Sequence, residues 1–155
     1  MSRLGIIKSS MRGEGCRSNQ LIDEFVRQSL LKWRNTEVLT WDLSGMTALS
    51  ASYAAICPTT DKLQQADYLA LALCSEDYAC LQQWLERLPY NQNLEKIPLF
   101  IFLAAESQAT NLAAAAWLTA RLPSVGLTAP VYIAVDHSKQ SQQAAYQQIA
   151  ALMAC

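Results

Sequence analysis

The chain has 155 residues, of which 52% are hydrophobic and 16% are charged, and its formal net charge is −1. This length predicts one domain covering residues 1–155, and the composition excludes a disordered polar chain. Charges of both signs are spread along the sequence without a basic stripe, so no nucleic-acid partner is expected. No apolar run reaches the roughly 18 residues that cross a bilayer, so no membrane partner is expected either.

The cysteines are odd in number and are never spaced as Cys-x-x-Cys; they are Cys16, Cys57, Cys74, Cys80 and Cys155. No signal peptide is expected ahead of Ser2. We therefore expect free thiols in a reducing compartment and a cytoplasmic location. His137 is the only histidine, so no zinc site is predicted.

Short apolar segments, mostly continuous, alternate with longer periodic ones. The first kind predicts strands at 4–7, 37–41, 67–73, 97–103 and 130–135. The second kind predicts helices at 18–33, near 60–65, and at 75–88, 110–122 and 138–153. Ser18 is the expected N-cap of the first helix, and residues 44–57 are expected to form an irregular connection.

Strand–helix–strand units with short connections build parallel sheets. Five strands in about 150 residues predict an α/β fold, a flavodoxin-like three-layer αβα sandwich with the strand order 2-1-3-4-5. A response-regulator receiver shares this topology but has paired acids after its first strand. Here the first strand ends in Lys8-Ser9-Ser10, which does not favour that alternative.

The loop at residues 8–20 supplies hydroxyl groups, two arginines and two glycines, and it leads into a helix. Open parallel sheets bind ligands beyond the carboxyl ends of their strands, where the strand order reverses. Backbone N–H groups at a helix start and arginine side chains suit a phosphate. A simple turn followed by a capped helix explains the same residues.

The segment 4–21 resembles the opening of the flavodoxin-like NADPH-dependent FMN reductase family. That family begins with a strand, then Gly-Ser-x-Arg, a short gap and Ser-x-x-x-x-Leu. Here Ser10-Met11-Arg12 matches the Ser-x-Arg element. Ser18-Asn19-Gln20-Leu21 fits the start of the family's first helix, after a gap longer than is typical. The resemblance implies that the FMN phosphate is held by five residues: Ser10, Arg12, Ser18, Asn19 and Gln20.

Two further loops carry the resemblance less closely. After its third strand the family has Pro-Glu-Tyr-Asn-Gly along the flavin ring, where this sequence has Ser75-Glu76-Asp77-Tyr78-Ala79. After its fourth strand the family has a glycine-rich turn, whereas residues 104–111 contain no glycine. The resemblance implies ring contacts from these two loops, by Ser75, Glu76, Asp77, Tyr78 and Glu106.

The function that the resemblance implies is that of an FMN-binding oxidoreductase. NAD(P)H, the co-substrate, delivers hydride to the flavin, and the reduced flavin passes electrons to a small-molecule acceptor. The cofactor carries this chemistry, so no catalytic residue is assigned to the protein. Members of the family commonly form dimers or tetramers, which implies a homodimer or homotetramer here.

Two alternatives stay open. The glycine-free loop after the fourth predicted strand also suits a flavodoxin-like scaffold that has lost flavin and serves as an interaction protein. A one-electron flavodoxin-type carrier is the third possibility, although such carriers are usually acidic. The run Asp136-His137-Ser138 has the residue types of a hydrolytic triad, but no Gly-x-Ser-x-Gly motif occurs, and we expect His137 to be an exposed loop residue.

Overall fold

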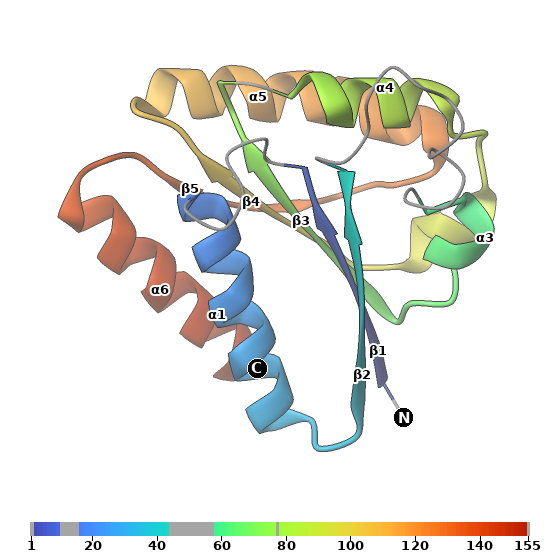
Figure 1. Ribbon diagram of the computed structural model, residues 1–155, viewed down its shortest axis with the longest axis horizontal. Coiled ribbons are helices and arrows are strands. Elements are labelled where there is room, and N and C mark those ends of the chain that lie inside the picture. Colours follow the sequence, from blue (N-terminus) through green and yellow to red (C-terminus); the bar gives the residue numbers. More distant parts are fainter. Residues whose placement is uncertain (1, 10–15, 44–57, 77, 155) are drawn as a thin grey trace.

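The computed structural model describes residues 2–9, 16–43, 58–76 and 78–154. Within these residues the chain forms a five-stranded parallel sheet with the order β2-β1-β3-β4-β5 (Figure 1). The strands are β1 (Ser2–Lys8), β2 (Thr36–Asp42), β3 (Tyr68–Cys74), β4 (Leu99–Ala104) and β5 (Val131–Val135). The strand order predicted from the sequence is confirmed.

Helices cover both faces of this sheet (Figure 1). They are α1 (Arg17–Lys32), α3 (Thr60–Leu63), α4 (Ala79–Arg87), α5 (Gln108–Arg121) and α6 (Lys139–Ala154), with short 3-10 helices η4 (Gln92–Lys96) and η5 (Leu122–Val125). Helices α1 and α6 pack on one face, and α3, α4 and α5 pack on the other. The three-layer αβα sandwich is therefore also confirmed.

The apolar periodicity of α1 explains how it docks. Leu21, Ile22 and Phe25 are at most 2% exposed, and they form the stripe that faces the sheet. The Phe25 ring lies 5.1 Å from the Phe100 ring and 5.4 Å from the Phe102 ring, both on β4. Burying a phenylalanine side chain in this way contributes about 2–3 kcal/mol.

The strands differ in burial according to their place in the sheet. The central strand β3 is buried along almost its whole length, as its continuous apolar sequence predicts. Strand β2 lies at the sheet edge, where Glu37, Thr40 and Asp42 are exposed and the other residues are partly buried. The mixed pattern of β2 thus reflects its edge position.

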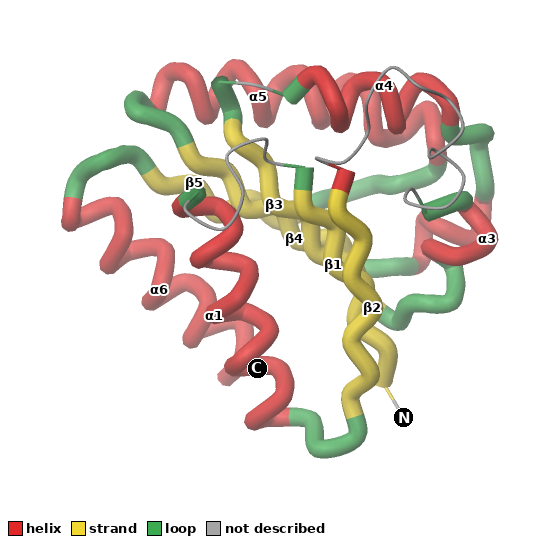
Figure 2. Tube along the Cα trace, viewed as in Figure 1, coloured by secondary structure: helices red, strands yellow, loops and turns green. Residues whose placement is uncertain are grey.

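All strands are parallel, so their carboxyl ends lie along one edge of the sheet. Strand β1 pairs with β2 on one side, with Lys8 opposite Asp42, and with β3 on the other, with Lys8 opposite Ala72. Figure 2 shows the carboxyl ends of β1 and β2 side by side. The strand order therefore reverses between β1 and β3, and this is where the fold class places a ligand.

Two helix starts differ from the sequence-based prediction by two or more residues, for local reasons. Helix α4 begins at Ala79 instead of residue 75, because Ser75 and Glu76 form the loop that leaves β3. Helix α5 begins at Gln108 instead of residue 110, because the Ser107 side chain accepts a hydrogen bond from the Thr110 N–H and caps it. The connection predicted at 44–57 lies outside the described residues.

In the part of the chain that the structure describes, no helix has both the length and the apolarity that crossing a membrane requires.

Candidate functional site

The candidate site is the carboxyl edge of the sheet, where the start of α1 and the loops after β3, β4 and β5 lie. Three of the predicted site residues, Ser10, Arg12 and Asp77, fall outside the described residues, and their assignment stays a prediction. The other predicted residues belong to the start of α1 and to the loops after β3 and β4.

The start of α1 differs from the predicted one. Cys16 is the N-cap and Ser18 lies inside the first turn, so the predicted capping role of Ser18 is wrong. The Ser18 hydroxyl is completely buried, 3.1 Å from the Cys16 thiol. Asn19 is also buried, whereas Gln20 is exposed. As they stand, Ser18 and Asn19 shape the helix start more than they offer side chains to a ligand.

The backbone at this helix start is suited to an anion. The first N–H groups of a helix have no acceptor within the helix. The Cys16 side chain makes no capping hydrogen bond, and the first turn contains no acidic residue. The positive end of the helix dipole is therefore not neutralised by its own first turn.

Arg17, which the sequence analysis did not single out, joins α1 to two other loops. Its guanidinium donates to the carbonyl oxygen of Asp136 after β5, and to that of Ala105 after β4 at 3.5 Å. These carbonyl groups are neutral, so the guanidinium keeps its positive charge beside the helix start. Arg17 could not have been found from spacing, because its partners lie 119 and 88 residues away.

A buried polar network fixes the loop after β3. The Ser75 hydroxyl donates to the Asn111 side-chain oxygen at 2.7 Å, and the Asn111 amide donates to the Val135 carbonyl oxygen at 2.9 Å. Ser75 and Asn111 are 3% and 1% exposed. The network links the ends of β3 and β5 through α5. Ser75 was predicted as a ring contact, but its hydroxyl hydrogen is donated to Asn111 within the protein.

A second chain of hydrogen bonds joins the three loops at the surface. The Glu106 N–H donates to the Glu76 carboxylate at 2.8 Å, and the Glu106 carbonyl oxygen lies 2.8 Å from His137 Nδ1. The two predicted residues Glu76 and Glu106 are thus brought together. His137 is exposed, as predicted.

The residues next to His137 cap α6 and do not form a triad with it. The Asp136 carboxylate accepts from the Ser138 N–H at 2.7 Å and from the Ser141 hydroxyl at 2.8 Å. Hydrogen bonds from Ser138, and then from Ser141, lower the pKa of Asp136 to about 2. Asp136 is therefore ionised over the whole neutral range and is committed to the helix start.

Tyr78 forms a wall of the largest hollow among the described pockets. Its ring lies 4.8 Å from the Trp117 ring of α5. The hollow has a volume of about 580 Å³ and opens between the loop after β3 and the first turns of α5. Its lining includes three residues predicted as ring contacts and described here, namely Ser75, Glu76 and Tyr78. A hollow of this size suits a small ring-shaped ligand.

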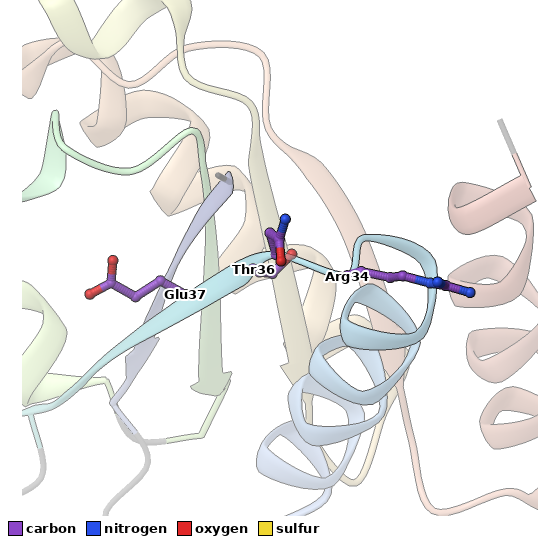
Figure 3. A pocket seen from close by; sticks show the side chains of 4 residues that line it. Arg34, Thr36 and Glu37 are labelled. Carbon is purple, nitrogen blue, oxygen red and sulfur yellow. The ribbon is translucent and has the colours of Figure 1, made fainter.

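Another pocket lies at the opposite end of the sheet. It has a volume of about 300 Å³ and is lined by residues 34–37, at the turn between α1 and β2. Figure 3 shows Arg34, Thr36 and Glu37 pointing in different directions, so their polar groups do not converge on one ligand. We therefore take the carboxyl edge as the candidate site.

The cysteines within the described residues are Cys16, Cys74 and Cys80, and all three are buried. Burial in apolar surroundings is typical of structural thiols. Among the described residues, no group of three or more His, Cys, Asp and Glu side chains is placed to hold a metal ion.

Comparison of the sequence with protein-family models and with curated proteins gave no match. Comparison of the structure gave many. An FMN-dependent NADH-azoreductase from Bacillus anthracis, solved in complex with FMN, has a TM-score of 0.71 at 10% identity over 99% of this chain and 98% of its own. An NADH:FMN oxidoreductase has a TM-score of 0.74 at 15% identity, with 99% and 89% covered. Flavodoxin 1 from Bacillus cereus has a TM-score of 0.60 at 14% identity, with 96% and 95% covered.

These neighbours agree with the flavodoxin-like fold that the resemblance of residues 4–21 implies. Their identities to this chain are 10–15%. At this level the likeness concerns the fold, and a fold alone does not fix a function. The chain has the flavodoxin-like fold.

Proposed function

We propose that the protein is an FMN-binding oxidoreductase that uses NAD(P)H as co-substrate and passes electrons to a small acceptor. The observation that carries this proposal is the start of α1. It lies at the carboxyl end of the strand where the order reverses, has no capping side-chain bond, and carries Arg17 beside it. Arrangements of this kind receive phosphates.

The donors present at the carboxyl edge fit FMN in two parts. The phosphate would be held by the N–H groups of the first turn of α1, together with Ser10 and Arg12, which the sequence resemblance assigns to it. The loops after β3 and β4 would orient the ring through Glu76, Tyr78 and Glu106. When bound, the flavin supplies the hydride and electron chemistry, and the chain's own residues bind it, orient it and exclude water.

The proposal is tested by titrating the purified protein with FMN and with riboflavin while flavin fluorescence is recorded. We expect FMN to bind at least tenfold more tightly than riboflavin, because only FMN carries the phosphate (about 1.4 kcal/mol per factor of ten). Arg12→Ala should remove this preference. Arg34→Ala, an exposed arginine at the other end of the sheet, is the matched control and should keep it. Equal affinities for FMN and riboflavin in the wild type would contradict the proposal.

A second candidate function is favoured by the loops after β3 and β4. The Glu106 N–H is already bonded to Glu76, the Tyr78 ring already contacts Trp117, and the connection at 105–107 is short and has no glycine. A scaffold that has lost flavin would show these features. It would bind neither FMN nor riboflavin, and would not oxidise NAD(P)H.

The one-electron carrier is separated from the reductase by a different measurement. With FMN bound and oxygen excluded, the reductase bleaches the flavin absorbance when NADPH or NADH is added alone. A carrier bleaches only after a partner reductase is added.

A further inference from the structure

Strand β5 forms an open edge of the sheet beside α6. Among the described residues it pairs only with β4. The strand Val131–Val135 is apolar apart from the Tyr132 hydroxyl, and its first residue, Val131, is 42% exposed. A groove with a volume of about 330 Å³ lies between this strand and α6, and its lining is mainly apolar, with Ile133 and Leu152 among its walls. An unpaired edge strand therefore lies next to an apolar groove.

One hydrogen bond shows which backbone groups point out of this edge. The Val135 carbonyl oxygen accepts from the Ala105 N–H at 3.1 Å, so the backbone groups of Val135 face β4. The backbone groups of successive residues in a strand point to opposite sides. Those of Ile133 therefore also face β4, whereas the N–H and C=O groups of Tyr132 and Ala134 point away from the sheet.

Both ends of this outward-facing stretch are closed. Pro130, which precedes β5, has no N–H. At the other end, the Asp136 N–H donates to the Ser141 hydroxyl at 3.0 Å, and the Asp136 carbonyl oxygen accepts from Arg17. Within the described part of the chain, the unpaired outward groups of this edge are therefore confined to the two positions between these ends.

The opposite edge of the sheet is protected by charge, and this one is not. Strand β2 carries Glu37 and Asp42, and Glu37 pairs with Arg3 of β1 at 3.3 Å. Charged side chains on an edge strand discourage pairing with another chain. Residues 122–135 include no charged residue, and α6 has only Lys139, in its first turn. Strand β5 thus lacks the protection that β2 has.

The lack of charge favours a second copy of this chain as the occupant of the edge. A twofold axis brings a surface against itself, so a net charge on that surface would be repelled by its own image. About an axis at Ile133, residues equally far from it on either side face each other, so Asp136 lies opposite Pro130 of the second copy. No like charges then meet along the strand. A charged partner, by contrast, would find no opposite charge here to attract it.

We propose that β5 pairs in antiparallel fashion with β5 of a second copy, about a twofold axis at Ile133, and so forms a homodimer with a continuous sheet. Tyr132 of each copy then faces Ala134 of the other, and each such pair exchanges both of its N–H···O bonds. This register satisfies all the outward backbone groups of both strands. The two α6 helices lie on the same face of the sheet, on either side of the new strand pair. The proposal is independent of the proposed function, and FMN binding neither supports nor contradicts it.

Sedimentation velocity of the purified protein over a range of concentrations tests whether the dimer forms. A strand pair this short, with its flanking helices, makes a small interface, so we expect half of the chains to be dimeric at roughly 10–100 µM. The mass of one chain is 17.2 kDa, and the weight-average mass should rise toward twice this value with concentration. A mass of 17.2 kDa at every concentration up to about 1 mM overturns the proposal.

Variants locate the interface. Val131→Lys places a charge on each side of the strand pair at a position that is already exposed, and it should raise the dissociation constant of the dimer at least tenfold. Thr40→Lys makes the same kind of change at an exposed position of the other edge strand, and as the matched control it should leave the dissociation constant unchanged. Ala134→Pro removes an outward N–H that β4 does not use, and it should also prevent pairing. A dimer that survives both Val131→Lys and Ala134→Pro overturns the proposal.

Amide hydrogen exchange, followed by 1H–15N spectra of the wild type, tests the register. The N–H groups of Ile133 and Val135 face β4 and should exchange slowly at every protein concentration. Those of Tyr132 and Ala134 should exchange at least about tenfold more slowly at concentrations where the dimer predominates than in dilute protein. Exchange at these two positions that does not change with concentration overturns the register, whether or not a dimer forms.

Discussion

Replacing Asn111 by alanine tests whether the buried network holds the carboxyl edge together. The substitution removes the acceptor of the Ser75 hydroxyl and one of the two donors to the Val135 carbonyl oxygen. The second donor to that oxygen, the Ala105 N–H at 3.1 Å, remains. Only Ser75 is therefore left unsatisfied, and we expect a loss of about 2–3 kcal/mol in the free energy of unfolding.

Urea unfolding followed by tryptophan fluorescence measures this loss from the midpoint and the slope. Ser75→Ala should cost about 1–2 kcal/mol, and the double variant should cost about 1 kcal/mol less than the sum, because the two side chains share one bond. Gln108→Ala, the exposed partner of the Asn111 amide at 3.3 Å, is the control and should stay within about 0.5 kcal/mol. Additive losses for Ser75 and Asn111, or a loss below about 0.5 kcal/mol for Asn111→Ala, would refute this reasoning.

Three further expectations concern other parts of the chain. Gly126→Ala should destabilise by about 2–4 kcal/mol in urea unfolding, because Gly126 has φ 102° and an added Cβ would overlap the Asn91 carbonyl oxygen. Trp84→Phe should cost about 2–4 kcal/mol, because it removes the 2.9 Å bond from the indole N–H to the Pro58 carbonyl oxygen and leaves a void at a fully buried site. The pKa of Asp136 is lowered from 3.8 to about 2, so its contribution to stability is present above pH 4 and is lost as the pH falls toward 2. The stability difference between the wild type and Asp136→Asn should shrink over that interval; a difference that is constant with pH would speak against it.

Much of the fold could be predicted because its signals are local. The continuous apolar run that became β3 and the stripe of Leu21, Ile22 and Phe25 on α1 each identify one element. Their alternation along the chain then leaves few topologies, and the order with β1 inside the sheet is one of them. The predicted starts of the helices were less accurate. A cap such as Ser107 acts through a single side-chain hydrogen bond, which the periodicity of apolar residues does not reveal.

The site was harder to predict, because its contacts join distant residues. Ser18 has the residue type of an N-cap and is followed by an apolar stripe, yet the helix begins one residue before it. Tyr78 resembles a ring contact in sequence, but its ring meets Trp117 of another helix. Asn111 is the centre of a buried network between β3 and β5, whose members are distant in sequence.

The hydrogen bonds of Arg17 determine when, during synthesis, the start of α1 can take up its final position. Residue 17 leaves the ribosome early, but its carbonyl partners at positions 105 and 136 follow much later. Domains fold as units during elongation, and contacts that are distant in sequence form late. The start of α1 therefore reaches its final setting only after β5 has joined β4, so a nascent chain released before residue 136 lacks this anchor.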